Sequence, residues 1–184
     1  MKLSNPNHHA GTAPILGRGP RDWMCTFTGV QYYPAAPREE DVRIVDIAHH
    51  LARLCRFTGA IRPEHYSVAE HSVHVSYLVP PEFALEGLMH DSPEAYICDL
   101  NRPTKINCPD YARIEEKNWL VIAKKFDLAR ELPACVNDAD NALLLAERDA
   151  LMPKHDAWQL SVYPTTTLDY SKVKILALGP NDAE

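Results

Sequence analysis

Proline residues divide the centre of this chain into segments that can each form one helix. Pro80 and Pro81 follow a segment that begins with a capping box at Ser67 and Glu70, and Pro81 can occupy the first turn of the next helix. A proline inside a helix removes a backbone hydrogen bond and clashes with the preceding turn, so Pro93 should kink or end that next helix. We therefore expect a chain of separate helices.

Apolar residues at helical spacing predict where these helices lie. The first stripe runs from Ile44 to Phe57 and places Arg56 at the helix end, where a cation suits the helix dipole. The other predicted ranges are 67–79, 81–97 with its interruption, 109–126 and 137–152. The third helix should direct Phe83, Leu85, Leu88 and Met89 toward the core, and residues 99–105 should form a loop.

The remaining segments indicate an all-α protein with one small β element. Aromatic residues mixed with glycine and proline over residues 22–41 predict short strands or turns, and a small β-hairpin near residue 30. Residues 1–22 have little apolar periodicity and should form an arm, whereas residues 23–184 should form a single domain. The 46% of hydrophobic residues suffices for a core of that size.

Charge and cysteine content exclude several classes of function. A formal net charge of −6 and a sequence pI near 5.8 provide no basic field for a nucleic-acid polymer. The five cysteines are scattered without C-x-x-C spacing, which indicates reduced thiols rather than disulfides or a zinc ribbon. No apolar run reaches the roughly 18 residues of a membrane span, and no signal-peptide pattern opens the chain. We expect a soluble cytoplasmic protein with no membrane partner.

The dipeptide His90-Asp91 is the first candidate for chemistry, although a His-Asp pair alone is a weak signal. Random order would give about 0.6 such pairs in a chain of this composition. The chain contains a second pair, His155-Asp156, which has no helical context and no acidic partner at a suitable spacing. We interpret that second pair as surface.

The neighbours of His90-Asp91 set it apart. Glu94 lies four positions after His90, so one helical turn can direct an imidazole and two carboxylates toward one space. His71 would lie at a similar height if its helix runs antiparallel across the proline turn, and Asp140 shares the apolar face of a later helix. A buried cluster of this kind is costly unless a cation neutralises it.

These residues resemble the HD-domain family of metal-dependent phosphohydrolases, in which a histidine, a later His-Asp pair and a final aspartate occur in this order. The resemblance extends through SVAEHSVHVS, HDSPEAYICDLNRPTK and DADNALLLAERD, and covers roughly residues 23–155. The chain looks most similar to small bacterial 5′-deoxynucleotidases and to phage dATP triphosphohydrolases. The implied fold is the all-α HD-domain fold, and a homo-oligomer is also implied.

The resemblance assigns a role to each matching position. It implies that one divalent cation, such as Zn²⁺, Co²⁺, Mn²⁺ or Mg²⁺, is bound by His71, His90, Asp91 and Asp140. Glu94 matches the residue that acts on the attacking water, and Asp99 matches a second acidic residue near that water or near a second ion. Further matching positions would contact the substrate: Arg56 and Lys105 at the phosphates, and Trp23, Met24 and Pro103 at the base.

Each substrate residue and several other polar residues also have an ordinary structural interpretation. Arg56 could cap a helix, Lys105 could be a solvated loop charge, and Trp23 could anchor the arm. Glu147 could pair with Arg148 or a loop amide. The histidines outside the cluster fit ordinary roles: one of His49 and His50 exposed and the other hydrogen-bonded, His74 beside the cluster and His65 at its mouth.

The function expected from the resemblance is hydrolysis of dATP to deoxyadenosine and triphosphate, with water attacking the α-phosphorus. The alternative enzyme is a 5′-deoxynucleotidase that acts on deoxynucleoside monophosphates. From other classes, a metal-binding regulatory module without catalysis and a metal-free structural domain both stay open. The base, the sugar and the metal are not determined by these residues.

Overall fold

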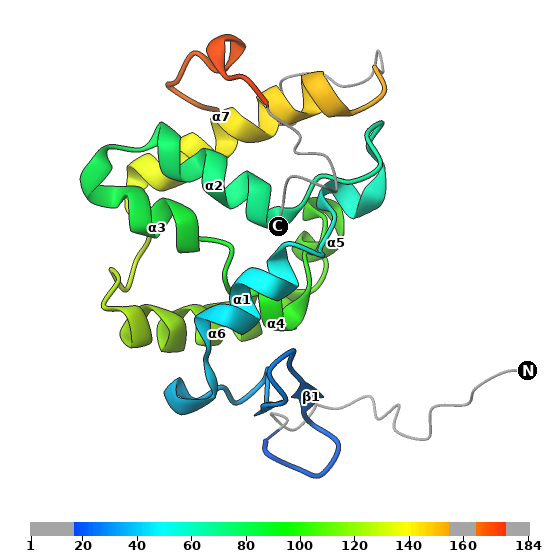
Figure 1. Cartoon of the computed structure of the whole chain (residues 1–184), viewed down its shortest axis with the longest axis vertical. Helices are drawn as coiled ribbons and strands as arrows, with labels where there is room; N and C mark the ends of the chain where they lie inside the picture. Colours follow the sequence, from blue (N-terminus) through cyan, green and yellow to red (C-terminus); the bar gives the residue numbers. More distant parts are fainter. Residues whose placement is uncertain (1–16, 155–164, 176–184) are drawn as a thin grey trace, which may run out of the picture.

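The protein is mostly helical, with one small antiparallel sheet near its N-terminus (Figure 1). The computed structural model describes residues 17–154 and 165–175. Its strands and α-helices are β1 (Met24–Cys25), β2 (Gln31–Tyr32), α1 (Ile44–Leu51), α2 (Val68–Leu78), α3 (Ala84–Met89), α4 (Glu94–Ile97), α5 (Arg102–Ile106), α6 (Pro109–Phe126) and α7 (Ala134–Leu151). The predicted all-α class and the hairpin near residue 30 are confirmed. Most of the predicted arm and the pair His155-Asp156 lie outside the described residues.

Two hydrophobic clusters hold the helices together. One joins β2, α1 and α6 through buried side chains that include Tyr32, Ile47 and Ile122. The other joins α2 to α7 and includes Val75 and Leu143. In Figure 1, α2, α3 and α7 occupy one end of the molecule and the hairpin lies at the opposite end.

Several predicted helix ends are confirmed. The Ser67 side chain accepts a hydrogen bond from the Glu70 backbone, and the Glu70 carboxylate accepts one from the Ser67 backbone, so the capping box begins α2 as predicted. Helix α6 has the predicted bounds, and α7 begins at Ala134, three residues before the predicted start. Pro133 has extended backbone, and the helix begins directly after it.

The first predicted helix is wrong beyond Leu51. The chain leaves helix α1 there, and its backbone pairs with the segment before α2: Val68 N–H donates to Leu54 O (2.9 Å), and Arg56 N–H donates to Tyr66 O (2.9 Å). Arg56 therefore does not cap a helix. It begins a short 3-10 turn, Arg56–Gly59, in which Phe57 and Thr58 have positive φ.

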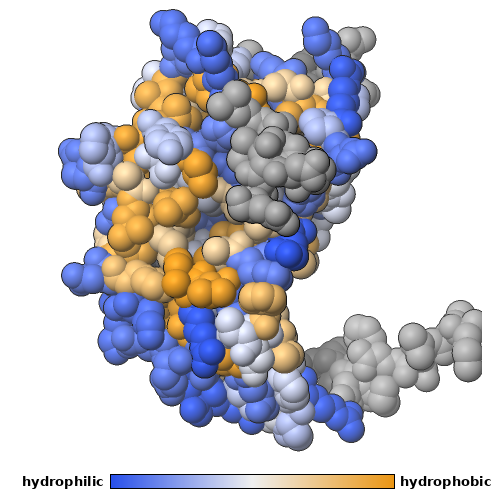
Figure 2. Space-filling model, viewed as in Figure 1, coloured by the Kyte–Doolittle hydropathy of each residue, from blue (hydrophilic) through white to orange (hydrophobic). Residues whose placement is uncertain are grey.

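The third predicted helix ends at Met89, and its predicted core face is partly wrong. Met89 is buried, but the side chains of Leu85 and Leu88 are 51% and 38% exposed. Gly87 explains the rotation of α3, because a Cβ at this position would lie only 3.0 Å from the Ser76 Cα on α2. The two helix backbones approach each other at this glycine, which turns the leucines outward. In Figure 2, hydrophobic surface gathers where α1 and α3 lie.

The predicted loop over residues 99–105 is also corrected, because part of it is helix α5. Asn101 caps this helix: its side-chain oxygen accepts a hydrogen bond from the Thr104 backbone at 3.1 Å. Pro103 lies in the first turn of α5, where backbone N–H groups make no hydrogen bond within the helix, so the missing N–H costs nothing. Lys105 consequently extends from a helix rather than from a loop.

Polar contacts of buried side chains fix the hairpin to the helices. Asp46 accepts hydrogen bonds from the backbone N–H and hydroxyl of Thr28 (2.7 and 2.9 Å), and Tyr32 donates to Asn118 (2.6 Å). His50 is the hydrogen-bonded member of the adjacent pair, because its ring contacts Ala95 O at 2.7 Å. Within the described part of the chain, none of the helices has the length and apolar character needed to cross a membrane.

Candidate metal centre

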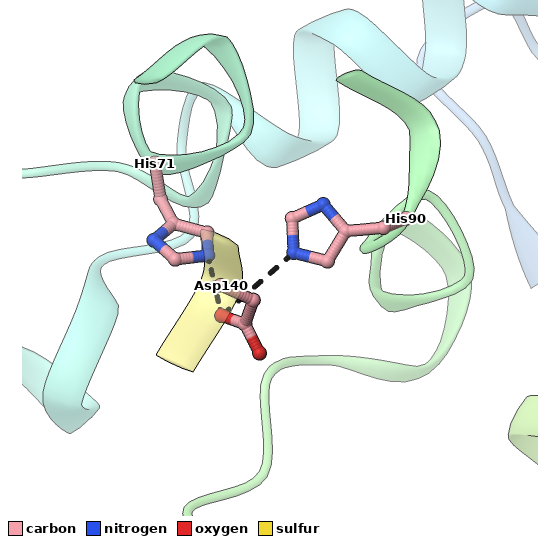
Figure 3. Close-up of side chains that lie close together, drawn as sticks. All are labelled: His71, His90 and Asp140. Atoms are coloured by element: carbon pink, nitrogen blue, oxygen red, sulfur yellow. Dashed lines mark ion pairs between the residues drawn. The ribbon is translucent and has the colours of Figure 1, made fainter. Parts of the chain in front are cut away.

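Three side chains from α2, the end of α3 and α7 point toward one another (Figure 3). His71 comes from α2, His90 follows the last residue of α3, and Asp140 comes from α7. The Asp140 Oδ1 atom lies 3.1 Å from His71 Nε2 and 3.9 Å from His90 Nε2. One potential ligand atom from each residue lies within 4.8 Å of the other two, so the group could hold a metal ion.

Asp91 adds a second carboxylate to this group. Its Oδ2 atom lies 3.3 Å from His90 Nε2 and 3.7 Å from His71 Nε2. The structure thus brings together all four residues predicted as metal ligands, although the helix breaks at the His-Asp pair instead of continuing through it. A tight turn after Met89 replaces the predicted helical turn, and Glu94 N–H donates to Asp91 O at 3.0 Å.

The other ring nitrogen of each histidine is already engaged. His90 Nδ1 lies 2.8 Å from the Gly87 carbonyl oxygen, which only accepts, so this nitrogen carries a proton. His71 Nδ1 lies 2.7 Å from the Glu147 carboxylate and donates to it. In the neutral rings, both Nε2 atoms then carry lone pairs that point toward the cluster.

The atoms that face each other in this cluster are close enough for ion pairs but are not aligned for good hydrogen bonds. Both Nε2 atoms and Asp91 Oδ2 are buried without a hydrogen-bond partner among the described residues. Buried polar atoms are rarely left in this way, because each unmet hydrogen bond costs about 1–3 kcal/mol. A divalent cation would bind all of these atoms together, so the donor set fits such an ion.

The charges of the cluster also favour a bound cation. Burial and Arg56 lower the pKa of His71, but Glu147 and Asp140 raise it by more, to about 9. Burial also opposes charge on Asp91, yet His90, His71 and Arg56 lower its pKa below the usual value. The carboxylates thus attract positive charge, which a proton or a metal ion can supply.

Arg56 and Glu147 lie directly behind the histidine. Arg56 Nη2 donates to Glu147 Oε2 at 3.2 Å, and Nη1 lies 3.6 Å from Asp91. The predicted partners of Glu147 are therefore wrong, because Glu147 binds Arg56, Tyr66 and His71 rather than Arg148 or a loop amide. Sequence analysis missed this role, although Glu147 lies seven residues after Asp140 on the same face of α7.

Glu94 and Asp99 form the acidic side of the cluster. Glu94 is 6% exposed, and its Oε2 atom has no hydrogen-bond partner within the described ranges. Burial, followed by the charges of Asp91 and Asp99, raises the pKa of Glu94 well above its usual value. Burial also raises the pKa of Asp99 against the opposing charge of Arg56. Both carboxyl groups are therefore stronger bases than a carboxylate in water.

The residue before Asp99 has a strained backbone. Cys98 has φ 75° and ψ 154°, a region that is nearly exclusive to glycine. Its backbone is held on both sides, since Cys98 N–H donates to Glu94 O at 2.9 Å and Cys98 O accepts from the Tyr111 hydroxyl. The strain is therefore stored where the chain turns Asp99 toward the cluster.

Cys98→Gly is expected to stabilise the protein by about 1 kcal/mol. Relief of the strain contributes roughly 1–3 kcal/mol, and the greater freedom of glycine in the unfolded chain costs about 0.5–1 kcal/mol. Thermal or urea unfolding measures the difference. Cys98→Ala removes the thiol but retains a Cβ, so it should give no such gain; equal stabilisation by both variants would contradict strain as the cause.

The residues predicted to contact the substrate are less closely grouped than the predicted metal ligands. Lys105 Nζ lies 2.6 Å from Glu115, yet its charge still lowers the pKa of Glu94 and Asp99. Trp23 is 43% exposed beside the hairpin, and its indole N–H donates to Pro20 O at 3.2 Å. The hydrogen bond of Trp23 stays within the segment before β1, Pro103 lies in the first turn of α5, and Figure 1 places the hairpin far from α7. Their roles stay predictions.

Two histidines near the cluster have structural contacts. His74 Nδ1 lies 3.1 Å from the Tyr66 hydroxyl, which also donates to Glu147. His74 is thus connected to His71 through two side chains, Tyr66 and Glu147. His65 Nε2 lies 3.1 Å from Ala52 O.

Comparison with known proteins gives the family but no activity. No family model matches the chain. YfdR of Escherichia coli is 45% identical over 123 residues, which cover 67% of this chain and 68% of YfdR. The chain belongs to the YfdR family. An uncharacterized protein of Rhodobacter capsulatus is 30% identical over 131 residues, which cover 66% of this chain and 67% of that protein. Because YfdR is itself described as uncharacterized, membership of its family assigns no reaction.

Proposed function

We propose that this protein is a metal-dependent phosphohydrolase of the HD-domain type that converts dATP into deoxyadenosine and triphosphate. The observation that carries the proposal is the convergence of two imidazole Nε2 atoms and two carboxylates, with the buried carboxyl group of Glu94 beside them. A divalent cation bound by His71, His90, Asp91 and Asp140 would polarise a phosphoryl oxygen and stabilise the charge that develops on it.

Glu94 is the proposed general base. A base must hold a carboxyl group where a water molecule can reach it and must have a pKa high enough to accept a proton. The Oε2 atom of Glu94 has no partner among the described residues, and burial with two neighbouring carboxylates raises the Glu94 pKa. Asp99 is close enough for its charge to raise the pKa of Glu94, and its carboxylate can accept a hydrogen bond from the same water.

The contacts of the positively charged side chains favour a second candidate function, in which the substrate carries fewer phosphates. Arg56 already contacts two carboxylates, and Lys105 is paired with Glu115, so the charges of the two predicted phosphate-binding residues are already partly neutralised. This observation favours a 5′-deoxynucleotidase, whose monophosphate substrate needs less neutralisation. For the triphosphate, the remaining charge would come from Arg102 or from another subunit of the proposed homo-oligomer.

A substrate panel tests the proposal. The purified chain, loaded with Mn²⁺, Co²⁺, Mg²⁺ or Zn²⁺, is given each dNTP, dNMP and rNTP, with Asp91→Ala as the inactive control. Deoxyadenosine and intact triphosphate from dATP support the proposal, and in ¹⁸O-labelled water the label should appear in the triphosphate. Cleavage of monophosphates alone favours the nucleotidase. Cation binding without turnover of any substrate favours a regulatory module and contradicts catalysis.

A further inference from the structure

We propose that Glu147 is a positioning residue for the metal centre, which holds the His71 ring so that Nε2 faces the cation. This inference rests on the metal-binding part of the proposed function and on no particular substrate. Glu147 is fully buried in α7, two turns beyond Asp140, and it touches none of the atoms that would bind the cation directly. It acts through His71.

Three donors converge on the Glu147 carboxylate. Oε1 accepts hydrogen bonds from His71 Nδ1 (2.7 Å) and the Tyr66 hydroxyl (2.8 Å), whereas Oε2 accepts from Arg56 Nη2 (3.2 Å). A buried carboxylate is costly unless it is paired and hydrogen-bonded, and these contacts meet both conditions. The carboxylate is therefore fixed in place before any ligand binds.

A charged acceptor at this position has a specific effect on the ring. Because Glu147 can only accept, the proton of the neutral His71 ring is held at Nδ1 and the lone pair is left at Nε2. The negative charge also increases the basicity of the ring as a metal ligand. His90 has only the neutral Gly87 carbonyl oxygen behind it, so the two histidines are supported differently.

Arg56 also takes part in this arrangement. Its guanidinium contacts Glu147 on one side and approaches Asp91 on the other, so it balances the charges of a ligand carboxylate and of the positioning carboxylate. The Nε–H group of Arg56 is buried and has no hydrogen-bond partner among the described residues.

Glu147→Gln tests the inference by cation affinity rather than by activity. The full chain is titrated with Co²⁺, followed by calorimetry and by the visible absorption of the bound ion. We expect the variant to bind Co²⁺ about 10–100-fold more weakly, with altered absorption, because loss of a residue that orients a ligand typically costs this much. Wild-type affinity and absorption in Glu147→Gln would overturn the proposal.

A pair of tyrosine variants separates an effect on the position of Glu147 from an effect on the stability of the fold. Tyr66 and Tyr32 are both fully buried, and each donates one hydrogen bond, to Glu147 and to Asn118 respectively. Both Tyr→Phe variants should lower the unfolding temperature, but only Tyr66→Phe should weaken Co²⁺ binding. Equal Co²⁺ affinity in the two variants overturns the inference even if Glu147→Gln does not fold. Failure of the wild type to bind any cation would refute the metal site itself.

Discussion

Asp140→Ala is expected to reduce the affinity for Mn²⁺ or Co²⁺ by more than the roughly 10–100-fold that loss of an orienting residue costs. Asp140 Oδ1 lies between the two histidine Nε2 atoms, so the variant removes an anionic ligand from the middle of the donor set. The Asp140 side chain is 33% exposed, and its carboxylate lies close to that of Asp91. Its removal should therefore leave the fold intact.

Asp138→Ala is the matched control on the same helix. Asp138 accepts hydrogen bonds from the backbone and hydroxyl of Thr167, and it has no place in the cluster. Isothermal titration of both variants should show normal cation affinity for Asp138→Ala and a large loss for Asp140→Ala. A similar loss of cation affinity in both variants would mean that the substitutions disturb the packing of α7 and that Asp140 is not a ligand.

Glu94→Gln is expected to lower kcat by about 10²–10⁴-fold while the protein still binds its cation. The amide has nearly the same shape as the carboxyl group but cannot accept the proton of an attacking water. The variant also removes a buried acid from beside Asp91 and Asp99, so cation affinity and stability should change little compared with the rate. Single-turnover kinetics with dATP and a cation titration measure the two effects separately.

The surface variant Glu82→Gln serves as the control for Glu94→Gln, because Glu82 is exposed in the turn before α3. It should retain the wild-type rate. If Glu94→Gln also retained that rate, another group would be the base. If it lost cation binding together with the rate, Glu94 would be a ligand instead.

Local signals in the sequence predicted the parts of the fold that depend on local chemistry. The capping box of α2 and the proline at the start of α6 act within one helical turn, and both helices begin where predicted. The end of α1 depends on residues far along the chain, because the backbone of Leu54 pairs with Val68. Apolar periodicity alone could not show this competing contact.

The same distinction applies to the candidate site. The convergence of the four predicted metal ligands was predictable, since their order and helical spacing lie in the sequence and the structure brings the four side chains together. Glu147 was predicted to pair with Arg148 or a loop amide, and its contacts with His71 and Arg56 were missed. Its partner Arg56 directly precedes the turn at Phe57 and Thr58, whose positive φ neither residue type favours.

The most direct test of the metal centre is anomalous diffraction from crystals grown with Co²⁺. One ion should lie between His71 Nε2, His90 Nε2 and the carboxylates of Asp91 and Asp140, at ligand distances of about 2.0–2.2 Å. An ion bound elsewhere, or no ion at these side chains at saturating Co²⁺, would contradict the assignment of this cluster as a metal centre.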